Sequence, residues 1–348
     1  MLLKKNPNVM VGILIVLVSF FVYTDQVAGS AANFSVNTNI PDNQIDKSKT
    51  YFNLQMSKGQ KQDITVTLKN ETNKDVTVEI GINSAKTNPN GVIEYGKNDI
   101  LIDSSLKYPL DDLIKGPSSV VLSANQSQNV TFNVTMPEQT FDGIVLGGLT
   151  FQQKTSEVVA DTKKQGASVQ NEFAYAVAVV LKETDAVVLP NLNLLKVKAG
   201  QNNYRNVINA TIQNEHAAIL SNVKVTANIY AKNGTSPVYS SVKNKMQIAP
   251  NTYWNYPISL DGTKMKPGKY RINMVISGTS NNQEKTWNFT KSFNITADEA
   301  DTLNKTDVNV KANTNNTNWL VIVMALLIIL LLLVILIGIF FLQRKKNI

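Results

Sequence analysis

Apolar and polar residues alternate through most of the chain. The alternation is clearest in five stretches, ITVTL (64–68), VTVEI (76–80), VTFNV (130–134), VKVTANI (223–229) and YRINMVI (270–276). A period of two is typical of strands that bury one face, and short strands at this spacing favour antiparallel sandwiches. The pattern predicts an all-β ectodomain made of two tandem immunoglobulin-like antiparallel β-sandwiches.

The alternating pattern also occurs twice. Residues 64–95 and 207–239 each contain a strand that ends in Asn, a polar turn, a second strand and an Asn-Gly pair. The strand-ending residues are Asn70 and Asn214. Asn-Gly pairs favour hairpin turns, so Asn90-Gly91 and Asn233-Gly234 are aligned as equivalent turns. We infer an internal duplication.

The first copy is longer than the second. Asn70 to Asn125 spans 55 residues, whereas the corresponding stretch from Asn214 to Asn251 spans 37. The first copy therefore holds about 18 additional residues, which the alignment places within residues 97–117.

The N-terminus has the pattern of a secretory signal peptide. Lys4 and Lys5 precede an apolar run at 9–23, and small residues follow in VAGSAA. A charged start, a short apolar core and a small-residue exit predict export, with cleavage between residues 29 and 32.

The C-terminus has the pattern of a membrane anchor. The 24 residues from Trp319 to Leu342 carry no charge, which is long enough to span a bilayer. Arg344, Lys345 and Lys346 follow, and the positive-inside rule keeps such a cluster in the cytoplasm. The predicted location is a single-pass cell-membrane protein with its ectodomain outside, in the cell wall.

These features divide the chain into six predicted parts. They are a signal peptide (1–31), an N-terminal sandwich with the insertion (33–188), a second sandwich (189–296), a flexible stalk (297–318), a transmembrane helix (319–342) and a cytoplasmic basic tail (343–348). The stalk is predicted because that segment is polar and has no period.

Composition limits the partners. Removing Asp25 and the five basic residues at the two ends leaves 29 basic and 25 acidic residues in the ectodomain. No basic run is interleaved with aromatic residues, so nucleic-acid binding has no signature. The chain has no cysteine, which is common in exported proteins of Gram-positive bacteria.

Candidate catalytic chemistry is sparse. The single histidine, His216, lies in a polar turn, where a solvated side chain is expected. Asp111 and Asp112 are adjacent and would point to opposite faces of a strand; after Pro109 they indicate a turn or a helix start. We expect no catalytic residue, no metal site and no cofactor.

Exposed aromatic residues are the remaining candidates for binding. Trp254 and Tyr256 share one face of a strand, either the core or a recognition patch, which leaves Tyr253 outside. Tyr95, Tyr108 and Leu110 lie in or beside the insertion with Asp111 and Asp112. These residues and Tyr253 form the candidate binding set.

The segment FDGIVLGGLTF (141–151) contains three glycines, of which Gly143 precedes the strand and Gly147-Gly148 interrupt it. The corresponding strand of the second copy has no internal glycine, so the fold itself does not require this pair. We expect a close approach there, by the insertion first and by a ligand second.

The order of motifs resembles the WxL-interacting proteins of Gram-positive bacteria. The resemblance rests on NPNGVIEY, YPLDDLIKGP, MPEQTFDGIVLGGLTF, FAYAVAVVLKE, IAPNTYWNYPI and KPGKYRINMVI, followed by the membrane helix. It implies a peptidoglycan-binding first domain, a second domain that binds a host ligand such as a matrix protein, and association with a WxL-domain surface protein. Family limits place FAYAVAVVLKE (173–183) in the second domain, whereas strand pairing places it in the first.

Two functions follow from this resemblance and the residue patterns. The first is a non-enzymatic, membrane-anchored surface scaffold or adhesin that binds peptidoglycan and WxL-type proteins. The alternative is a chaperone-like assembly factor that lends a strand edge to exported proteins.

Overall fold

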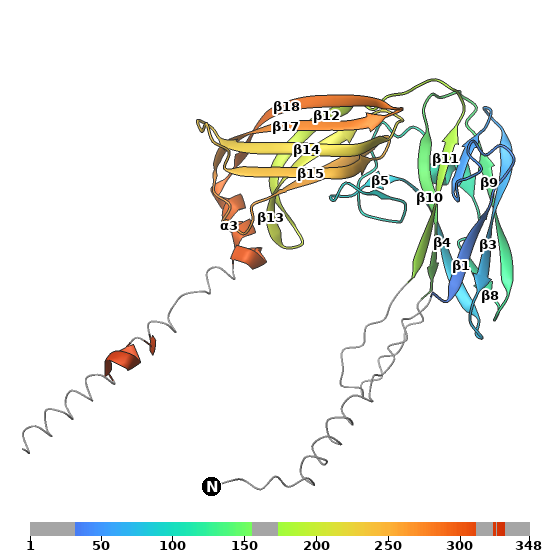
Figure 1. The fold of residues 1–348 in the computed structure, drawn as a ribbon, viewed down its shortest axis with the longest axis horizontal. Helices are drawn as coiled ribbons and strands as arrows, with labels where there is room; N and C mark the ends of the chain where they lie inside the picture. Colours follow the sequence, from blue (N-terminus) through green and yellow to red (C-terminus); the bar gives the residue numbers. More distant parts are fainter. Residues whose placement is uncertain (1–31, 155–172, 311–322, 325, 331–348) are drawn as a thin grey trace, which may run out of the picture.

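A computed structural model describes residues 32–154, 173–310, 323–324 and 326–330. It contains two all-β domains, each built from two sheets (Figure 1). Domain one is formed by residues 34–154 and 173–182, and domain two by residues 192–310. The predicted signal peptide and basic tail lie outside the described residues, as does most of the predicted transmembrane helix.

Domain one packs a four-stranded sheet against a five-stranded sheet. The first sheet has the order β1 (Phe34–Asn39), β3 (Lys61–Asn70), β9 (Ser127–Thr135) and β7 (Ile114–Lys115). The second has the order β2 (Phe52–Gln55), β11 (Ala174–Lys182), β10 (Val145–Gln153), β4 (Val76–Ser84) and β8 (Ser119–Leu122). Their inward faces enclose one apolar core that includes Phe34, Phe132 and Phe151.

Domain two has the same plan. One sheet has the order β12 (Leu192–Asn202), β13 (Arg205–Asn214) and β16 (Thr252–Ser259). The other has the order β15 (Tyr239–Ile248), β14 (Leu220–Ala231), β17 (Gly268–Ser280) and β18 (Gln283–Ile295). Trp254 and Tyr256 are fully buried in its core, with their ring centroids 5.2 Å apart. The core alternative for these two residues is therefore confirmed, and Tyr253 is only partly buried.

Apart from β2 and β7, which occur only in domain one, the strand orders of the two domains match, as the duplication predicts. β1-β3-β9 corresponds to β12-β13-β16, and β8-β4-β10-β11 corresponds to β15-β14-β17-β18. β11, which covers FAYAVAVVLKE, pairs with β10 from Ala174 to Leu181 and therefore belongs structurally to domain one.

A buried asparagine closes the same corner in both domains. The Nδ2 atom of Asn70 donates to the carbonyl oxygens of Lys74, Leu122 and Ser123 at 2.7–3.1 Å. The Nδ2 atom of Asn214 donates to Ala218 and Ala249 at 2.8 and 2.9 Å. Both side chains are fully buried, and among their acceptors the carbonyl groups of Leu122, Ala218 and Ala249 are in buried hydrogen bonds that these amides satisfy.

The asparagines that open β9 and β16 are equivalent as well. Asn125 and Asn251 have φ angles of 56° and 47°, in the left-handed region that asparagine tolerates. The Asn125 amide donates to Thr72 at 2.9 Å and the Asn251 amide donates to His216 at 3.2 Å. The acceptors lie two residues after Asn70 and Asn214, which supports the alignment used to predict the duplication.

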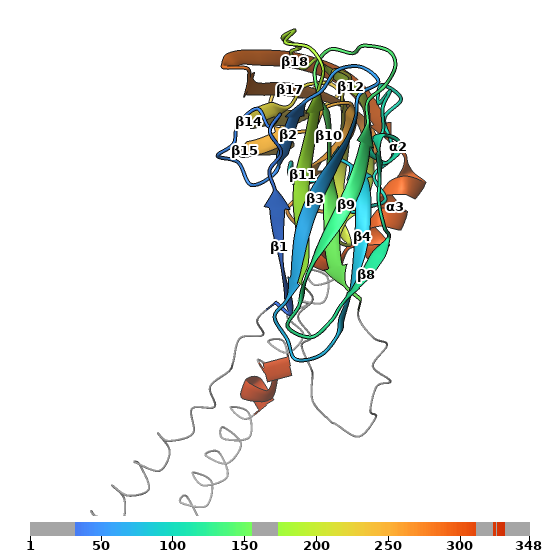
Figure 2. The same ribbon diagram turned by 90° about the vertical axis from the view of Figure 1, so that its right-hand side faces the viewer.

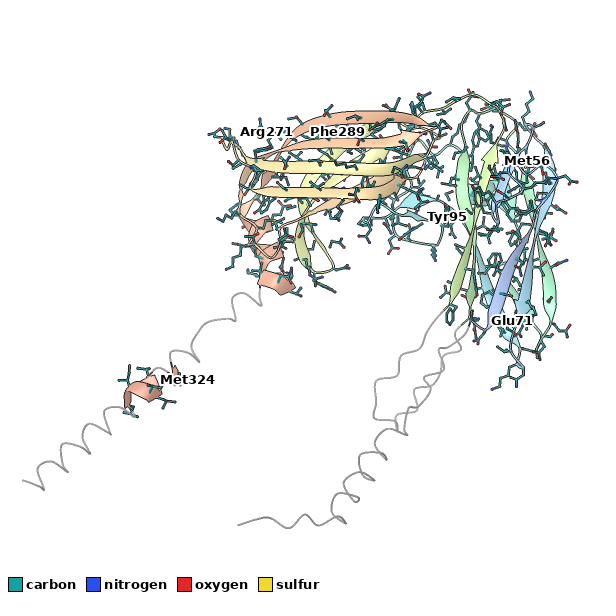
Figure 3. All side chains as sticks on the ribbon, viewed as in Figure 1. Met56, Glu71, Tyr95, Arg271, Phe289 and Met324 are labelled. Atoms are coloured by element: carbon teal, nitrogen blue, oxygen red, sulfur yellow. The ribbon has the colours of Figure 1, made fainter. Side chains whose placement is uncertain are left out.

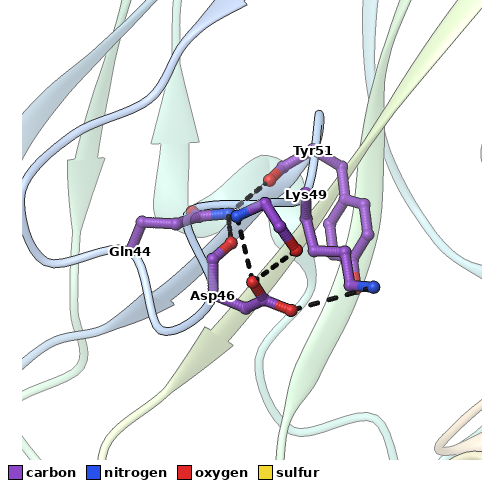
Figure 4. Close-up of polar contacts among 5 residues, drawn as sticks. Gln44, Asp46, Lys49 and Tyr51 are labelled. Atoms are coloured by element: carbon purple, nitrogen blue, oxygen red, sulfur yellow. Dashed lines mark hydrogen bonds and ion pairs between the residues drawn. The ribbon is translucent and has the colours of Figure 1, made fainter.

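The chain changes sheets between β1 and β2. Gln44 is buried in this loop and its Nε2 atom donates to the carbonyl oxygen of Tyr51 at 2.8 Å (Figure 4). Its Oε1 atom accepts from the Asn53 amide at 2.8 Å, and Asp46 caps Ser48 beside it. This loop carries the chain across to β2, which pairs in parallel with β11.

The additional segment of domain one is longer than predicted. Residues 85–118 connect β4 to β8, whereas residues 232–238 alone connect the corresponding β14 and β15. Asn90-Gly91 closes a small hairpin of β5 (Lys86–Thr87) and β6 (Ile93–Glu94) inside this segment. The alignment of Asn90-Gly91 with Asn233-Gly234 was therefore wrong, and the segment includes 85–96 as well as 97–117. We call residues 85–118 the excursion.

The predicted stalk begins as a helix, contrary to the expectation for residues 297–318. α3 (Ala297–Thr306) starts at Thr296, whose Oγ1 accepts from the Glu299 amide at 3.2 Å. Asn304 exchanges two hydrogen bonds with the Met265 backbone, and Ala300 is buried. Only a narrow strip of α3 packs on domain two, which explains why the sequence shows no helical period. Residues 311–318 lie outside the described residues.

Asp307 fastens the end of this helix to domain two. Its carboxylate accepts from the backbone amides of Asn206 at 2.7 Å and Val310 at 3.0 Å. Burial opposes ionisation of Asp307, but the backbone donors of Val310, Asn206 and Asn309 lower its pKa below the usual value. The described part of the segment is therefore integral to domain two.

Residues 323–324 and 326–330 of the predicted membrane helix are helical, and the apolar side chains of Met324 and of residues 326–330 are exposed. Among the residues that the structure describes, no helix reaches the length and hydrophobicity needed to cross a membrane.

Asn70→Ala should destabilise domain one selectively. The change removes the donor for the buried Leu122 carbonyl and for two partly buried carbonyls, and one unsatisfied buried group costs about 1–3 kcal/mol. Hydrogen exchange measured separately over each domain should show faster opening of domain one, and Asn214→Ala should do the same for domain two. Asn288→Ala, on the exposed side of β18, is the control. Equal loss of protection in both domains from either variant would contradict a local corner role.

Candidate binding site at the domain junction

The excursion lies between the two domains (Figures 1 and 3). Its hairpin is closed by Asn88, whose Oδ1 atom accepts from the amides of Asn90 and Val92 at 2.9 and 3.1 Å. Gly91 follows with a φ of 73°, which asparagine-glycine turns supply at little cost. Local turn chemistry therefore projects β5 and β6 out of the sandwich and towards domain two.

Hydrogen bonds join the excursion to domain two along its length. The Gln247 amide donates to the Gly91 carbonyl at 2.8 Å, and the Ala249 amide donates to Thr87 Oγ1 at 2.9 Å. Thr87 is 1% exposed, so water does not compete for this bond. The contacts anchor the excursion to the end of β15 and the start of β16.

The second half of the excursion binds the same region. Asp103 is buried and its Oδ1 atom accepts from Gln213 Nε2 at 3.0 Å. Asn251 Nδ2 donates to the Ser105 carbonyl and hydroxyl at 3.1 Å each, and Ile102 forms a β-bridge with Thr252. The residues that the sequence placed in an insertion are thus the main source of the interdomain contact.

A small apolar cluster fills the middle of the junction. It contains Ala85, Ile93, Leu146 and Ala249, with partly buried residues around them. Tyr95 belongs to this surround, and burial raises the pKa of its hydroxyl. The cluster combines side chains of both domains and is separate from either domain core.

Gly147 and Gly148, the two glycines within β10, leave room for the excursion to pack against this strand. A Cβ atom at Gly147 would lie 2.3 Å from the Asn83 carbonyl oxygen and 2.6 Å from Leu110 Cδ2. A Cβ atom at Gly148 would lie 2.6 Å from Tyr95 Cβ. Gly147 faces the core and Gly148 faces outward, so Leu110 and Tyr95 approach opposite faces of one strand. The close approach expected from the sequence involves the insertion through Leu110.

Gly143 makes the third close contact. It has a φ of 86°, and a Cβ atom there would lie 2.4 Å from the Ala217 carbonyl oxygen. The next residue, Ile144, donates its amide hydrogen to the same oxygen at 2.9 Å. The absence of a side chain at Gly143 therefore lets domain one contact the turn after Asn214.

Two hollows flank this contact. One of about 410 Å³ lies beside the connection between the domains and is lined by Ile144, Lys182, Val188, Ile219 and Asn281 among others. The other, of about 180 Å³, lies between Tyr108, Phe141, Leu146 and Pro250. Both are open to solvent and draw on both domains.

The remaining candidate residues occupy different settings. Tyr108 packs on Phe141 with centroids 5.4 Å apart, and Lys107 Nζ lies 5.1 Å from its ring. Leu110 is fully buried and Asp111 and Asp112 are exposed in α2 (Leu110–Leu113), as a helix start predicts. Tyr253 lies on β16, opposite Gln213 of β13. The candidates therefore do not form one site: Tyr95 and Tyr108 lie at the junction, and Leu110 is structural.

Sequence reasoning missed several junction residues. Thr87, Asp103 and Ser105 are small polar residues without a motif, and only their hydrogen-bond partners on domain two identify them as junction residues.

His216, expected to be solvated, is exposed and its Nδ1 atom lies 2.8 Å from the Leu189 carbonyl oxygen. Within the described residues, no three His, Asp or Glu side chains are grouped as a metal site requires.

Two family models match adjacent parts of the chain. Residues 34–153 match the peptidoglycan binding domain of the WxL Interacting Protein, and residues 164–305 match its host binding domain. The chain belongs to the WxL-interacting protein family. The second match begins before β11, so the family boundary and the structural boundary differ by one strand, as expected from the sequence. The matched domains are binding domains, and they indicate a surface protein with peptidoglycan-binding and host-binding parts.

Other comparisons reveal only distant similarity. No curated protein sequence matches the chain. A chain of the CsuC–CsuE chaperone-tip adhesion subunit complex from Acinetobacter baumannii is 10% identical with a TM-score of 0.33, covering 74% of this chain and 98% of that one. The E. coli chaperone DraB is 14% identical with a TM-score of 0.28, covering 77% and 98%. These similarities are too weak to inform function.

Gly148→Val should loosen the junction, and Gly147→Val should destabilise domain one. The valine at 148 would displace Tyr95. The valine at 147 would overpack the core against Leu110 and the Asn83 carbonyl, and overpacking lowers the free energy of unfolding by about 1–3 kcal/mol. A lower thermal unfolding temperature should reveal the effect of Gly147→Val, and faster hydrogen exchange over residues 85–96 should reveal the effect of Gly148→Val. Gly96→Ala is the matched control, because nothing lies within 4 Å of its position. A Gly147→Val variant as stable as this control would refute the close-approach interpretation.

Proposed function

We propose that this protein is a non-enzymatic scaffold or adhesin, anchored in the membrane by residues 319–342, that holds peptidoglycan through domain one and a host ligand through domain two. The observation that carries the proposal is the pairing of two binding-domain matches on one chain. The host ligand in this proposal is an extracellular-matrix protein.

The junction supports a scaffold role. Hydrogen bonds that domain two donates to the excursion hold the domains in one arrangement, and their acceptors are Thr87, Gly91, Asp103 and Ser105. A wall ligand on one domain and a host ligand on the other would then be kept at a defined separation. A WxL-domain surface protein is proposed as a further partner on the strength of the family membership.

The full-length chain in mild detergent should be retained on purified peptidoglycan, and should co-purify with a WxL protein of the same genome. Cellulose beads are the control matrix. Failure to bind peptidoglycan together with failure to bind the WxL protein would refute the proposal.

A second candidate function, strand addition to exported proteins, is favoured by one edge of domain one. β11 spans Ala174–Lys182, but β2 pairs with it only at Val179–Lys182. Along Ala174–Ala178, no strand of the described chain occupies that edge. The stretch AYAVA has no charge and no proline, the usual protections of an edge strand.

Strand addition predicts a local change in hydrogen exchange. Those amides of residues 174–178 that point away from β10 should become protected when a WxL protein is added, because an incoming strand would occupy the open edge. Amides of β18, at the edge of domain two, serve as the internal control. Binding of the WxL protein with no added protection at 174–178 would exclude this mode.

A further inference from the structure

The outer face of β1, β3 and β9 has an unusual composition. Every outward residue of these strands is Asn, Ser, Thr, Lys or Asp, and none is apolar or aromatic. The face lies on the side of domain one away from domain two (Figure 2). We call it the β1-β3-β9 face.

Its centre consists of two uncharged rows that cross the three strands. Asn37, Thr67 and Asn129 are in register in one row, and Asn39, Thr65 and Thr131 are in register in the next. Side chains directly opposite on neighbouring strands lie within contact distance, so each row is a continuous line of amide and hydroxyl groups.

Hydrogen bonds within the face leave amide donors available. Thr67 Oγ1 lies 2.8 Å from Asn129 Oδ1 and 3.2 Å from Asn39 Oδ1. These contacts orient the two side-chain amides through their oxygens. Among the described residues, the Nδ2 atoms of Asn39 and Asn129 have no protein partner, so both can donate to a ligand from opposite sides of β3.

The charged residues of the face are confined to its margins and are mostly compensated. Lys69 forms an ion pair with Glu71 at 2.8 Å, and Asp63 accepts from Asn133 Nδ2 at 2.5 Å. Lys61 lies at the opposite end of β3 from Lys69. A polyanion would have little to bind at the centre, whereas a neutral ligand rich in donors and acceptors would fit it.

The second copy shows that the fold does not dictate this composition. Thr211 and Asn255 occupy the positions of Thr67 and Asn129 and make the same bond at 2.7 Å. The neighbouring positions differ: Lys196 is paired with Thr211, and Asn209 pairs with Lys198 and Pro257. Only domain one surrounds the shared Thr–Asn pair with uncharged hydrogen-bonding side chains.

We propose that the β1-β3-β9 face binds the glycan strand of peptidoglycan. It does so through hydrogen bonds to the N-acetyl and hydroxyl groups of the glycan, and not through contacts with the stem peptides. The proposal rests on the proposed function of domain one. The glycan backbone offers carbonyl acceptors, N–H donors and hydroxyls without a formal charge on every unit, which matches the rows. Because the complementarity is neutral, binding depends little on ionic strength.

The test uses the full-length chain in mild detergent with two probes, intact peptidoglycan and uncharged oligomers of N-acetylglucosamine, which serve as glycan strands without stem peptides. The triple variant Asn39→Ala, Thr67→Ala, Asn129→Ala should bind both probes about tenfold more weakly, since it removes several hydrogen bonds. The isosteric double variant Asn39→Asp, Asn129→Asp should weaken binding as well, because it removes the amide donors. Thr211→Ala with Asn255→Ala is the matched control in domain two and should bind like the parent. All variants should keep the parent unfolding temperature.

Three results would overturn the proposal. They are parent-like binding of glycan strands by the folded triple variant, binding of stem peptides alone, and release from glycan strands by moderate salt or by a polyglycerol phosphate. In each of these the chain still binds the wall, so the proposed function stands while the face is wrong. A parent chain that binds neither probe would remove this inference together with the peptidoglycan-binding part of the proposed function.

Discussion

The structure depends on how closely one segment can approach a single strand. Gly147 and Gly148 remove the side chains that would otherwise stand on the two faces of β10. Leu110 then enters the core on one face and Tyr95 lies on the other. Without that double approach the excursion could not start and finish on domain one while its middle reaches domain two. The interdomain hydrogen bonds and the apolar cluster between the domains follow from this packing.

The duplication explains which features are shared and which are specialised. Both copies keep the buried corner asparagine, the left-handed asparagine just before β9 or β16, and the order of the strands that they share. They differ in the connection from β4 to β8, which corresponds to the one from β14 to β15, and in the side chains on the outer faces. Elements that satisfy buried backbone groups have been retained in both copies, whereas surfaces and one connection have diverged.

The sequence predicted the strands and the duplication because period-two alternation reports burial directly. The same reasoning placed Trp254 and Tyr256 on one face of a strand but left open whether that face was the core, and the close approach at Gly147 followed from the contrast between copies. The start of the excursion was misplaced because Asn90-Gly91 and Asn233-Gly234 have the same turn chemistry but close different hairpins. α3 was missed because a helix that buries only Ala300 shows no apolar stripe. Thr87 and Asp103 could not be predicted as junction residues, since nothing local distinguishes a polar residue that meets a partner domain from one that meets water.

The excursion has a mechanical consequence. The polypeptide passes from domain one to domain two once, through residues 183–191, and a single covalent crossing would act as a swivel under load. The excursion adds a second, non-covalent attachment at Gln247, Ala249 and Asn251, separated from that crossing by the Ile144–Ala217 contact. Two separated attachments resist torque as well as tension. Pulling on domain two would therefore be transmitted to domain one as a shearing force on several hydrogen bonds together, and not as bending of one flexible joint.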